Sequence, residues 1–214
     1  MTGLGEFLPR LLGGMVVNFE IAALALLLGF AVGFLLAALR LYGGALGAMA
    51  VPLIALMRAA PTFVVMFFLL NAIPRDAELF GEPFELSGVM TVALSLVPYA
   101  AAYVADSGLA ALQQMRAGEP LAALLFLPNL MRAFFVMVMS SGAAAAIGVT
   151  EGISIILRAA EKAPSFGDRL VLFAVGIVCF GIPLQAGLAV VRLLQRRLGH
   201  LLLRTRRAAA EGGG

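Results

Sequence analysis

Long apolar runs, separated by short polar or glycine- and proline-containing segments, follow one another along most of the chain. Five of these runs are long enough to cross a hydrocarbon core of about 30 Å as helices that rise about 1.5 Å per residue. They cover approximately residues 15–39, 51–73, 87–112, 133–149 and 170–191. The pattern predicts an all-α, polytopic membrane protein with about five transmembrane helices.

Composition supports this prediction and limits the number of domains. Hydrophobic residues make up 62% of the 214 residues and charged residues only 13%, whereas soluble domains carry about a quarter charged residues. The apolar runs leave no room for a separate soluble domain. We therefore expect one transmembrane domain over residues 1–207, followed by a disordered tail of small and polar residues over 208–214.

Basic residues are distributed unequally between the two sides that five spans would define. Nine fall on one side: Arg40, Arg116, Arg132 and the six arginines from Arg192 to Arg207. Five fall on the other side: Arg10, Arg75, Arg158, Lys162 and Arg169. Because cytoplasmic loops carry an excess of Lys and Arg, we expect a cytoplasmic C-terminus and an external N-terminus.

Candidate enzyme chemistry is absent from the sequence. Cys179 is the single cysteine and His200 the single histidine, so neither a metal site nor a Cys/His nucleophile is expected. No phosphate-binding glycine loop, HExxH motif or suitably spaced carboxylate pair is present. We predict a protein that is not an enzyme and that binds no metal or cofactor itself.

Polar residues recur along one face of the third predicted span. Ser95, Tyr99, Tyr103, Asp106 and Gln113 follow at spacings of four, four, three and seven residues, which places them on one side of a helix. One interpretation is that Tyr99, Tyr103 and Asp106 line a translocation path. The other is a hydrogen-bonded patch between helices, in which Asp106 pairs with a basic residue such as Arg58 or Arg132.

Arg58 lies inside the second predicted span, three residues before Pro61. Proline removes a backbone donor and disfavours helix at the preceding residue, so a kink is expected here. Arg58 either caps the carbonyl groups that the kink frees or belongs to the path or a subunit contact.

Ser140 and Ser141 in the fourth span, and Gln185 in the fifth, are further polar residues at membrane depth. Small hydroxyl residues permit close helix packing, and polar ones also suit contact with a polar solute. Both interpretations remain open for these three residues, with packing favoured.

Read in order, these segments resemble the membrane subunits of bacterial ABC importers for polar amino acids, the histidine, glutamine and arginine permeases. Leu11 to Glu20 is similar to the opening LLxGxxVTLE of that family, and the stretch ending at Arg40 to its ALLR. Arg58 to Pro61, followed by Phe67 to Leu69, is similar to RGTP and FFL, and Ala101 to Asp106 to AAYLAE. Leu127-Pro128 corresponds to the Leu-Pro that opens the fourth span, and Ile147 to Glu151 to IGVxE.

The resemblance implies the fold of a type I ABC importer permease and one half of a translocation path that works by alternating access. It implies three protein partners: a cytoplasmic ABC ATPase that binds and hydrolyses the ATP, a sister permease subunit, and an external solute-binding protein. It also implies a multi-pass location in the bacterial cytoplasmic membrane. Contact with nucleic acid is not expected, because no basic stretch is interleaved with aromatic residues and Trp is absent.

The segment before the fourth span departs from the family. In the family this loop forms the helix that engages the ATPase, but here it is shorter by on the order of ten residues, or roughly 15 Å of helix. The residues that remain are Gly118, Glu119, Ala122, Ala123, Leu127 and Pro128. We therefore expect a weakly coupled member of a heteromeric pair. The alternatives are a non-transporting membrane scaffold or regulatory subunit, and an ion-coupled carrier or channel in which Asp106 takes up protons.

Overall fold

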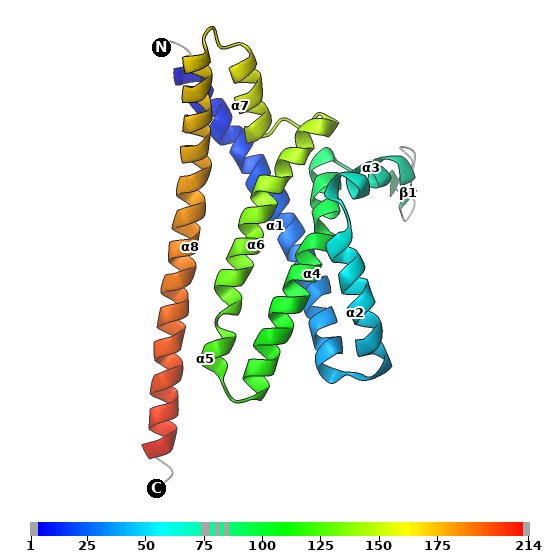
Figure 1. Cartoon of the computed structure of the whole chain (residues 1–214), viewed down its shortest axis with the longest axis vertical. Helices are drawn as coiled ribbons and strands as arrows, with labels where there is room; N and C mark the ends of the chain where they lie inside the picture. Colours follow the sequence, from blue (N-terminus) through cyan, green and yellow to red (C-terminus); the bar gives the residue numbers. More distant parts are fainter. Residues whose placement is uncertain (1–3, 74–77, 80–81, 84–85, 212–214) are drawn as a thin grey trace.

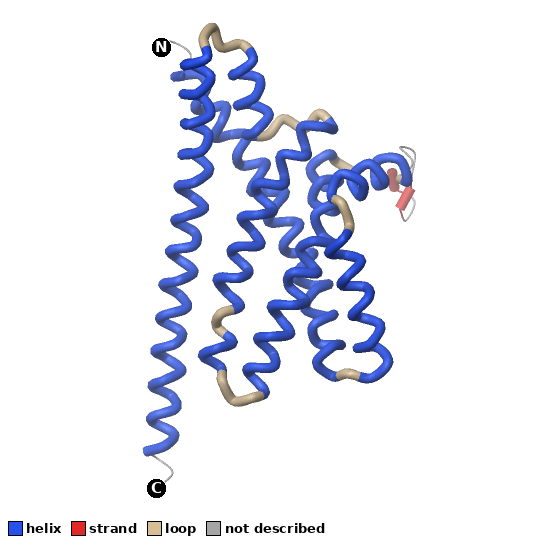
Figure 2. The backbone as a smooth tube through the Cα atoms, in the orientation of Figure 1, coloured by secondary structure: helices blue, strands red, loops and turns tan. Residues whose placement is uncertain are grey.

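A computed structural model describes residues 4–73, 78–79, 82–83 and 86–211, and it is almost entirely helical (Figures 1 and 2). The first half contains α1 (Leu4–Tyr42), α2 (Gly44–Ala59), α3 (Thr62–Ala72) and α4 (Gly88–Arg116). The second half contains α5 (Pro120–Ala123), α6 (Phe126–Ser140), a 3-10 helix η1 (Ser141–Ile147), α7 (Gly152–Glu161) and α8 (Phe166–Glu211). Two short antiparallel strands, β1 (Glu78–Leu79) and β2 (Glu82–Pro83), lie between α3 and α4.

The helices alternate in direction along the long axis of the molecule. In Figure 1, α1, α4 and α8 run from the N-terminal end to the opposite end, whereas α2 and α6 run back. Among the described residues, four helical segments are long and apolar enough to span a membrane, and the bent pair α2–α3 could supply a fifth span. The prediction of an all-α protein with about five spans is confirmed.

The second span differs from a continuous helix over residues 51–73. The α2 helix ends at Ala59, α3 begins at Thr62, and the two helices are bent by 94° at the break. Ala60 and Pro61 both have extended backbone angles there. The kink expected at Pro61 is therefore present, because proline withdraws a donor and disfavours helix at the residue before it.

The fourth span starts earlier than its apolar run and changes geometry near its end. The α6 helix begins at Phe126, before the predicted start at Ala133, and continues as the 3-10 helix η1 from Ser141 to Ile147. Gly148, with φ of 85°, closes η1 in the left-handed region that glycine adopts without steric cost.

The last helix is much longer than a membrane requires. At about 1.5 Å per residue, the 46 residues of α8 span roughly 69 Å, about twice a hydrocarbon core. The helix extends to Glu211, into the segment over 208–214 for which disorder was predicted. Alanine, at positions 208–210, is the strongest helix former. Residues 212–214 lie outside the described residues.

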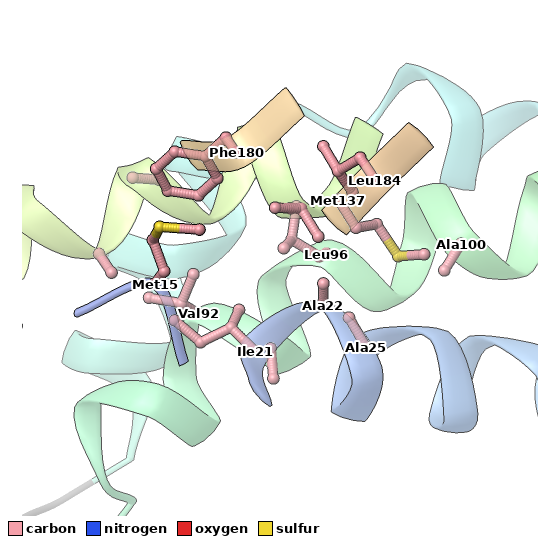
Figure 3. Close-up of a cluster of buried hydrophobic side chains, with 14 of the residues drawn as sticks. Met15, Ile21, Ala22, Ala25, Val92, Leu96, Ala100, Met137, Phe180 and Leu184 are labelled. Atoms are coloured by element: carbon pink, nitrogen blue, oxygen red, sulfur yellow. The ribbon is translucent and has the colours of Figure 1, made fainter. Parts of the chain in front are cut away.

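The α1 and α4 helices form the centre of the bundle and are in close contact. A Cβ added at Gly29 would lie 2.3 Å from the Cβ of Ala100, and one at Gly33 would lie 2.4 Å from the carbonyl oxygen of Ala101. Two glycines four residues apart thus let the helix backbones approach directly. Figure 3 shows the surrounding apolar cluster, in which Ile21 of α1, Leu96 of α4 and other buried side chains meet.

Large apolar side chains also cover much of the outer surface. Leu27 is 68% exposed, Leu56 68% and Ile177 73%, and they lie on α1, α2 and α8 respectively. Such a surface has no reason to exist in water but is expected where helices face lipid. The chain is a multi-pass membrane protein.

Candidate functional site

Three charged residues from three helices meet within the membrane-spanning part of the molecule. Arg40 lies near the end of α1, Arg58 near the end of α2 and Asp106 in the second half of α4. The Nη1 atom of Arg40 donates to Oδ1 of Asp106 at 3.1 Å, and Nη2 of Arg58 donates to Oδ2. We call Arg40, Arg58 and Asp106 the charge triad.

The charge triad carries a net charge of +1 and is only partly buried. The side chain of Arg40 is 26% exposed, that of Asp106 46% and that of Arg58 58%. Charged side chains in a membrane are costly and usually face the interior of an assembly or a watery cavity. The exposed part of the triad therefore marks a surface of the single chain that lipid would cover poorly.

The structure shows the ion-pair partners of Asp106 and Arg58. Asp106 pairs with Arg58, as one interpretation expected, but its second partner is Arg40 and not Arg132. Arg132 instead donates to Oδ1 of Asn129 at 3.4 Å. The guanidinium of Arg58 bonds Asp106, which joins α2 to α4.

Tyr99 and Tyr103 lie on α4 about two turns and one turn before Asp106, respectively. Their ring centroids are 6.3 Å apart, and both rings are half-buried against the main apolar cluster. Ser107 donates to the carbonyl oxygen of Tyr103 at 2.7 Å, which keeps its hydroxyl within its own helix. The two tyrosines and Asp106 therefore form a continuous strip on one helix, as the spacing predicted.

Ser140, Ser141 and Gln185 make no hydrogen bond to this strip within the described part of the chain. Ser141 is fully buried, and its hydroxyl donates to the carbonyl oxygen of Val138 at 2.7 Å. Ser140 is half-buried at the junction of α6 and η1, and Gln185 is exposed on α8 after Pro183.

A second polar cluster, which the sequence reasoning missed, joins α1, the α6–η1 junction and the start of α7. Nδ2 of Asn18 donates to Oγ of Ser141 at 2.8 Å and to Oε2 of Glu151 at 2.7 Å. Oδ1 of Asn18 accepts from the backbone nitrogen of Gly152 at 2.8 Å. Asn18, Ser141 and Glu151 have no exposed surface.

Glu151 also begins α7 through a capping box. Its Oε1 accepts from the backbone nitrogen of Ser154 at 2.6 Å, and its Oε2 accepts from that of Ile153 at 2.7 Å. In return, Oγ of Ser154 accepts from the backbone nitrogen of Glu151 at 3.0 Å. The carboxylate thus satisfies donors at a helix start, where backbone dipoles favour negative charge.

One signal could have revealed this cluster. Asn18 is a polar residue inside the first apolar run, and an intramembrane polar group must find a partner. The partner, Glu151, is 133 residues away in the sequence, so only the tertiary structure identifies it.

The turn between α4 and α6 is short and lies beside α8. Gly118, with φ of 78°, follows α4, and Glu119 precedes Pro120 at the first position of the four-residue helix α5. Leu121 and Leu124 line a groove of about 430 Å³ together with Arg192 and Arg196 of α8. The shortened segment and the start of the arginine-rich tail therefore lie at the same end of the molecule (Figure 1).

Comparison with known proteins gives one structural relationship. No family model matches the sequence, and no curated protein matches it. The fold is similar to that of a chain in the crystal structure of an amino acid ABC transporter with histidines, with a TM-score of 0.71. The alignment covers 92% of this chain and 97% of that chain, at 17% sequence identity.

The chain has an ABC importer permease-like fold. This confirms the fold expected from the ordered sequence motifs. At 17% identity the similarity establishes the fold alone, so solute, partners and path residues are matters for a proposal.

Proposed function

We propose that the chain is a permease subunit of an ABC-type importer for a polar amino acid or a similar small solute. It would provide half of the translocation path by alternating access, with ATP bound and hydrolysed by a separate subunit. The observation that carries the proposal is the shared fold over nearly the whole length of both chains.

The proposed assembly places a sister permease beside the chain, an ABC ATPase at one end and a solute-binding protein at the other. We assign the end with the α4–α6 turn and the arginine-rich part of α8 to the cytoplasm of a bacterial cell, because basic residues are concentrated there. The N-terminus and α7 would then be external.

The proposed path runs along the strip formed by Tyr99, Tyr103 and the charge triad. Its support is chemical: half-exposed polar side chains at membrane depth require a polar neighbour, which a solute path between two subunits supplies. Weaker candidates for the path are Ser140, Ser141 and Gln185. Of these, Ser141 is already hydrogen-bonded and fully buried.

Purification from native membranes tests the proposal. A tagged chain, extracted in mild detergent, should carry an ABC ATPase and a second permease subunit in fixed stoichiometry, identified by mass spectrometry. Recovery of the chain without either subunit would contradict the proposed function.

A non-transporting membrane scaffold is the second candidate, and the four-residue α5 favours it, because so short a helix offers little surface to an ATPase. The two functions differ in what Asp106 does. In a reconstituted complex with a working transport assay, Asp106→Asn should reduce solute uptake at least several-fold if the strip lines the path. Unchanged uptake would favour the scaffold.

A further inference from the structure

A groove of about 680 Å³ lies between the N-terminal part of α1 and α7, at the end of the molecule away from the C-terminus (Figure 1). Its floor is apolar and includes Phe7, Val17, Ile155 and Ala159. We call it the α1–α7 groove. It lies apart from the charge triad, none of whose residues line it.

The groove exists because the two helices touch at one point and separate beside it. A Cβ added at Gly14 would lie 2.4 Å from Cδ1 of Ile155 and 2.8 Å from the backbone nitrogen of Gly152, so the helices are in contact there. A Cβ added at Gly13, which also lines the groove, would meet no heavy atom within 4 Å. The space above the contact is open and accessible to a ligand.

The rim of the groove is positively charged. Arg10, Arg158 and Lys162 line it together with a single acid, Glu6. Oε2 of Glu6 lies 3.7 Å from Nη2 of Arg10. Arg158 and Lys162 have no ion-pair partner among the described residues. Arg158 lies on α7 and Lys162 directly follows its last residue, Glu161, with a helical backbone, so the two residues, four positions apart, lie on the same side.

The groove lies at the N-terminal end of the first predicted span. Arg10 precedes the first residue of the predicted span, Met15, by five residues, or about 7.5 Å of helix. On the outer side of α1, Leu12 is 49% exposed and Val16 65%, so an apolar surface reaches up to the same level. A basic rim above an apolar floor at this depth matches the headgroup layer of a bilayer.

We propose that the α1–α7 groove binds an anionic phospholipid, with Arg158 and Lys162 contacting the phosphate-containing headgroup. The start of an acyl chain would lie on the apolar floor beside Ile155 and Ala159. An amphiphile satisfies both parts of the groove, whereas the acidic surface of a soluble protein would leave the floor in contact with water.

Native mass spectrometry of the full-length, delipidated protein tests the charge requirement. The probes are phosphatidylglycerol and phosphatidylcholine with the same acyl chains. We expect the unmodified chain to retain phosphatidylglycerol preferentially, and Arg158→Gln with Lys162→Gln to reduce that preference by about tenfold. Arg169→Gln, an exposed arginine at the same end but outside the groove, is the matched control and should change it little.

A steric variant tests the site without altering charge. Gly13→Phe should fill the groove and reduce phosphatidylglycerol retention, whereas Gly5→Phe should not, although its Cβ also meets open space. The proposal would be overturned if the Arg158/Lys162 double variant and Gly13→Phe retained as much phosphatidylglycerol as the unmodified chain. It would also be overturned if Arg169→Gln lost as much of this lipid as the double variant.

Two further arms identify the occupant. Millimolar inorganic phosphate should leave lipid retention nearly unchanged, because it cannot use the apolar floor; displacement of the lipid by phosphate would assign the groove to a free anion instead. A photoreactive amino acid replacing Gly13 should form lipid adducts in native membranes. A protein adduct in place of lipid would show that the groove is a protein contact.

Discussion

Glu151 is a carboxylate with no exposed surface, and the groups that donate to its oxygens are neutral. Asn18 and the backbone nitrogens at the start of α7 donate to it. Charge in such a place is tolerated only when every acceptor is filled. Together with Asn18, which also donates to Ser141, Glu151 joins three segments that are distant in sequence: the first half of α1, the α6–η1 junction and α7.

Removing this carboxylate should destabilise the protein markedly. Glu151→Ala leaves Asn18 and two backbone donors without their acceptor, for which we expect a loss of about 2–3 kcal/mol in unfolding free energy. Thermal unfolding in detergent measures this as a lower Tm. Glu161→Ala, at an exposed position on the same helix, should leave the Tm within error, and a Glu151 variant as stable as that control would refute the argument.

The charge triad predicts a measurable but modest coupling. Because Arg58 and Asp106 are about half exposed, their interaction should contribute on the order of 1 kcal/mol. A double-mutant cycle with Arg58→Gln and Asp106→Asn, followed by thermal unfolding, isolates this energy. The cycle of Asp106→Asn with Arg132→Gln should be additive, since Arg132 bonds Asn129 instead; coupling in that cycle alone would contradict the observed pairing.

At the scale of elements, the contact between α1 and α4 determines the arrangement of the bundle. Gly29 and Gly33 place bare backbone against Ala100 and Ala101, and any side chain there would collide with atoms of α4. The α2–α3 pair is attached to the same two helices through the charge triad and a small apolar cluster around Ile54 and Ala102. The α1–α4 pair is therefore the frame on which the broken span rests.

Alanine at either glycine should disrupt this frame. Gly29→Ala and Gly33→Ala each introduce a Cβ that would lie 2.3 or 2.4 Å from an atom of α4, well inside van der Waals contact. The helices would have to separate, which should lower the unfolding free energy by about 1–3 kcal/mol. Gly181→Ala in α8 is the control, because its Cβ would meet no heavy atom within 4 Å and alanine favours helix. Thermal unfolding should rank both α1 variants below the unmodified protein and the control at or above it.

At the scale of the whole molecule, we propose five crossings, counting the bent pair α2–α3 as one span, which would place the two ends of the chain on opposite sides of the bilayer. The α4–α6 turn shares a side with the C-terminal part of α8, while α7 shares a side with the N-terminus (Figure 1). The arginine-rich part of α8 extends beyond the hydrocarbon core, because a helix of 46 residues is far longer than about 30 Å requires.

Cysteine accessibility in oriented vesicles tests this topology. In a Cys179→Ala background, a membrane-impermeant thiol reagent should label Glu119→Cys only from the cytoplasmic side. It should label Ser165→Cys, in the connection between α7 and α8, only from the external side. Labelling of both positions from one side would require a different number of crossings and would remove the basis of the proposed assembly.

The apolar runs determined the approximate number and the order of the membrane-spanning segments, because burying backbone in lipid requires continuous internal hydrogen bonding and leaves helices as the available structure. Local chemistry also predicted the break at Pro61 and the shared face of Tyr99, Tyr103 and Asp106, since both follow from backbone sterics and helical spacing alone. These features needed no knowledge of neighbouring segments.

Only the tertiary structure decided which polar groups meet. The sequence offered Arg58 and Arg132 as partners for Asp106, but the end of α1 brings Arg40 instead, and Asn18 finds Glu151 across 133 positions. Such pairings depend on how far each helix is shifted and rotated against the next. Contacts such as Gly29 against Ala100 set those shifts and rotations. They depend on two segments at once, so neither segment's sequence alone determines them.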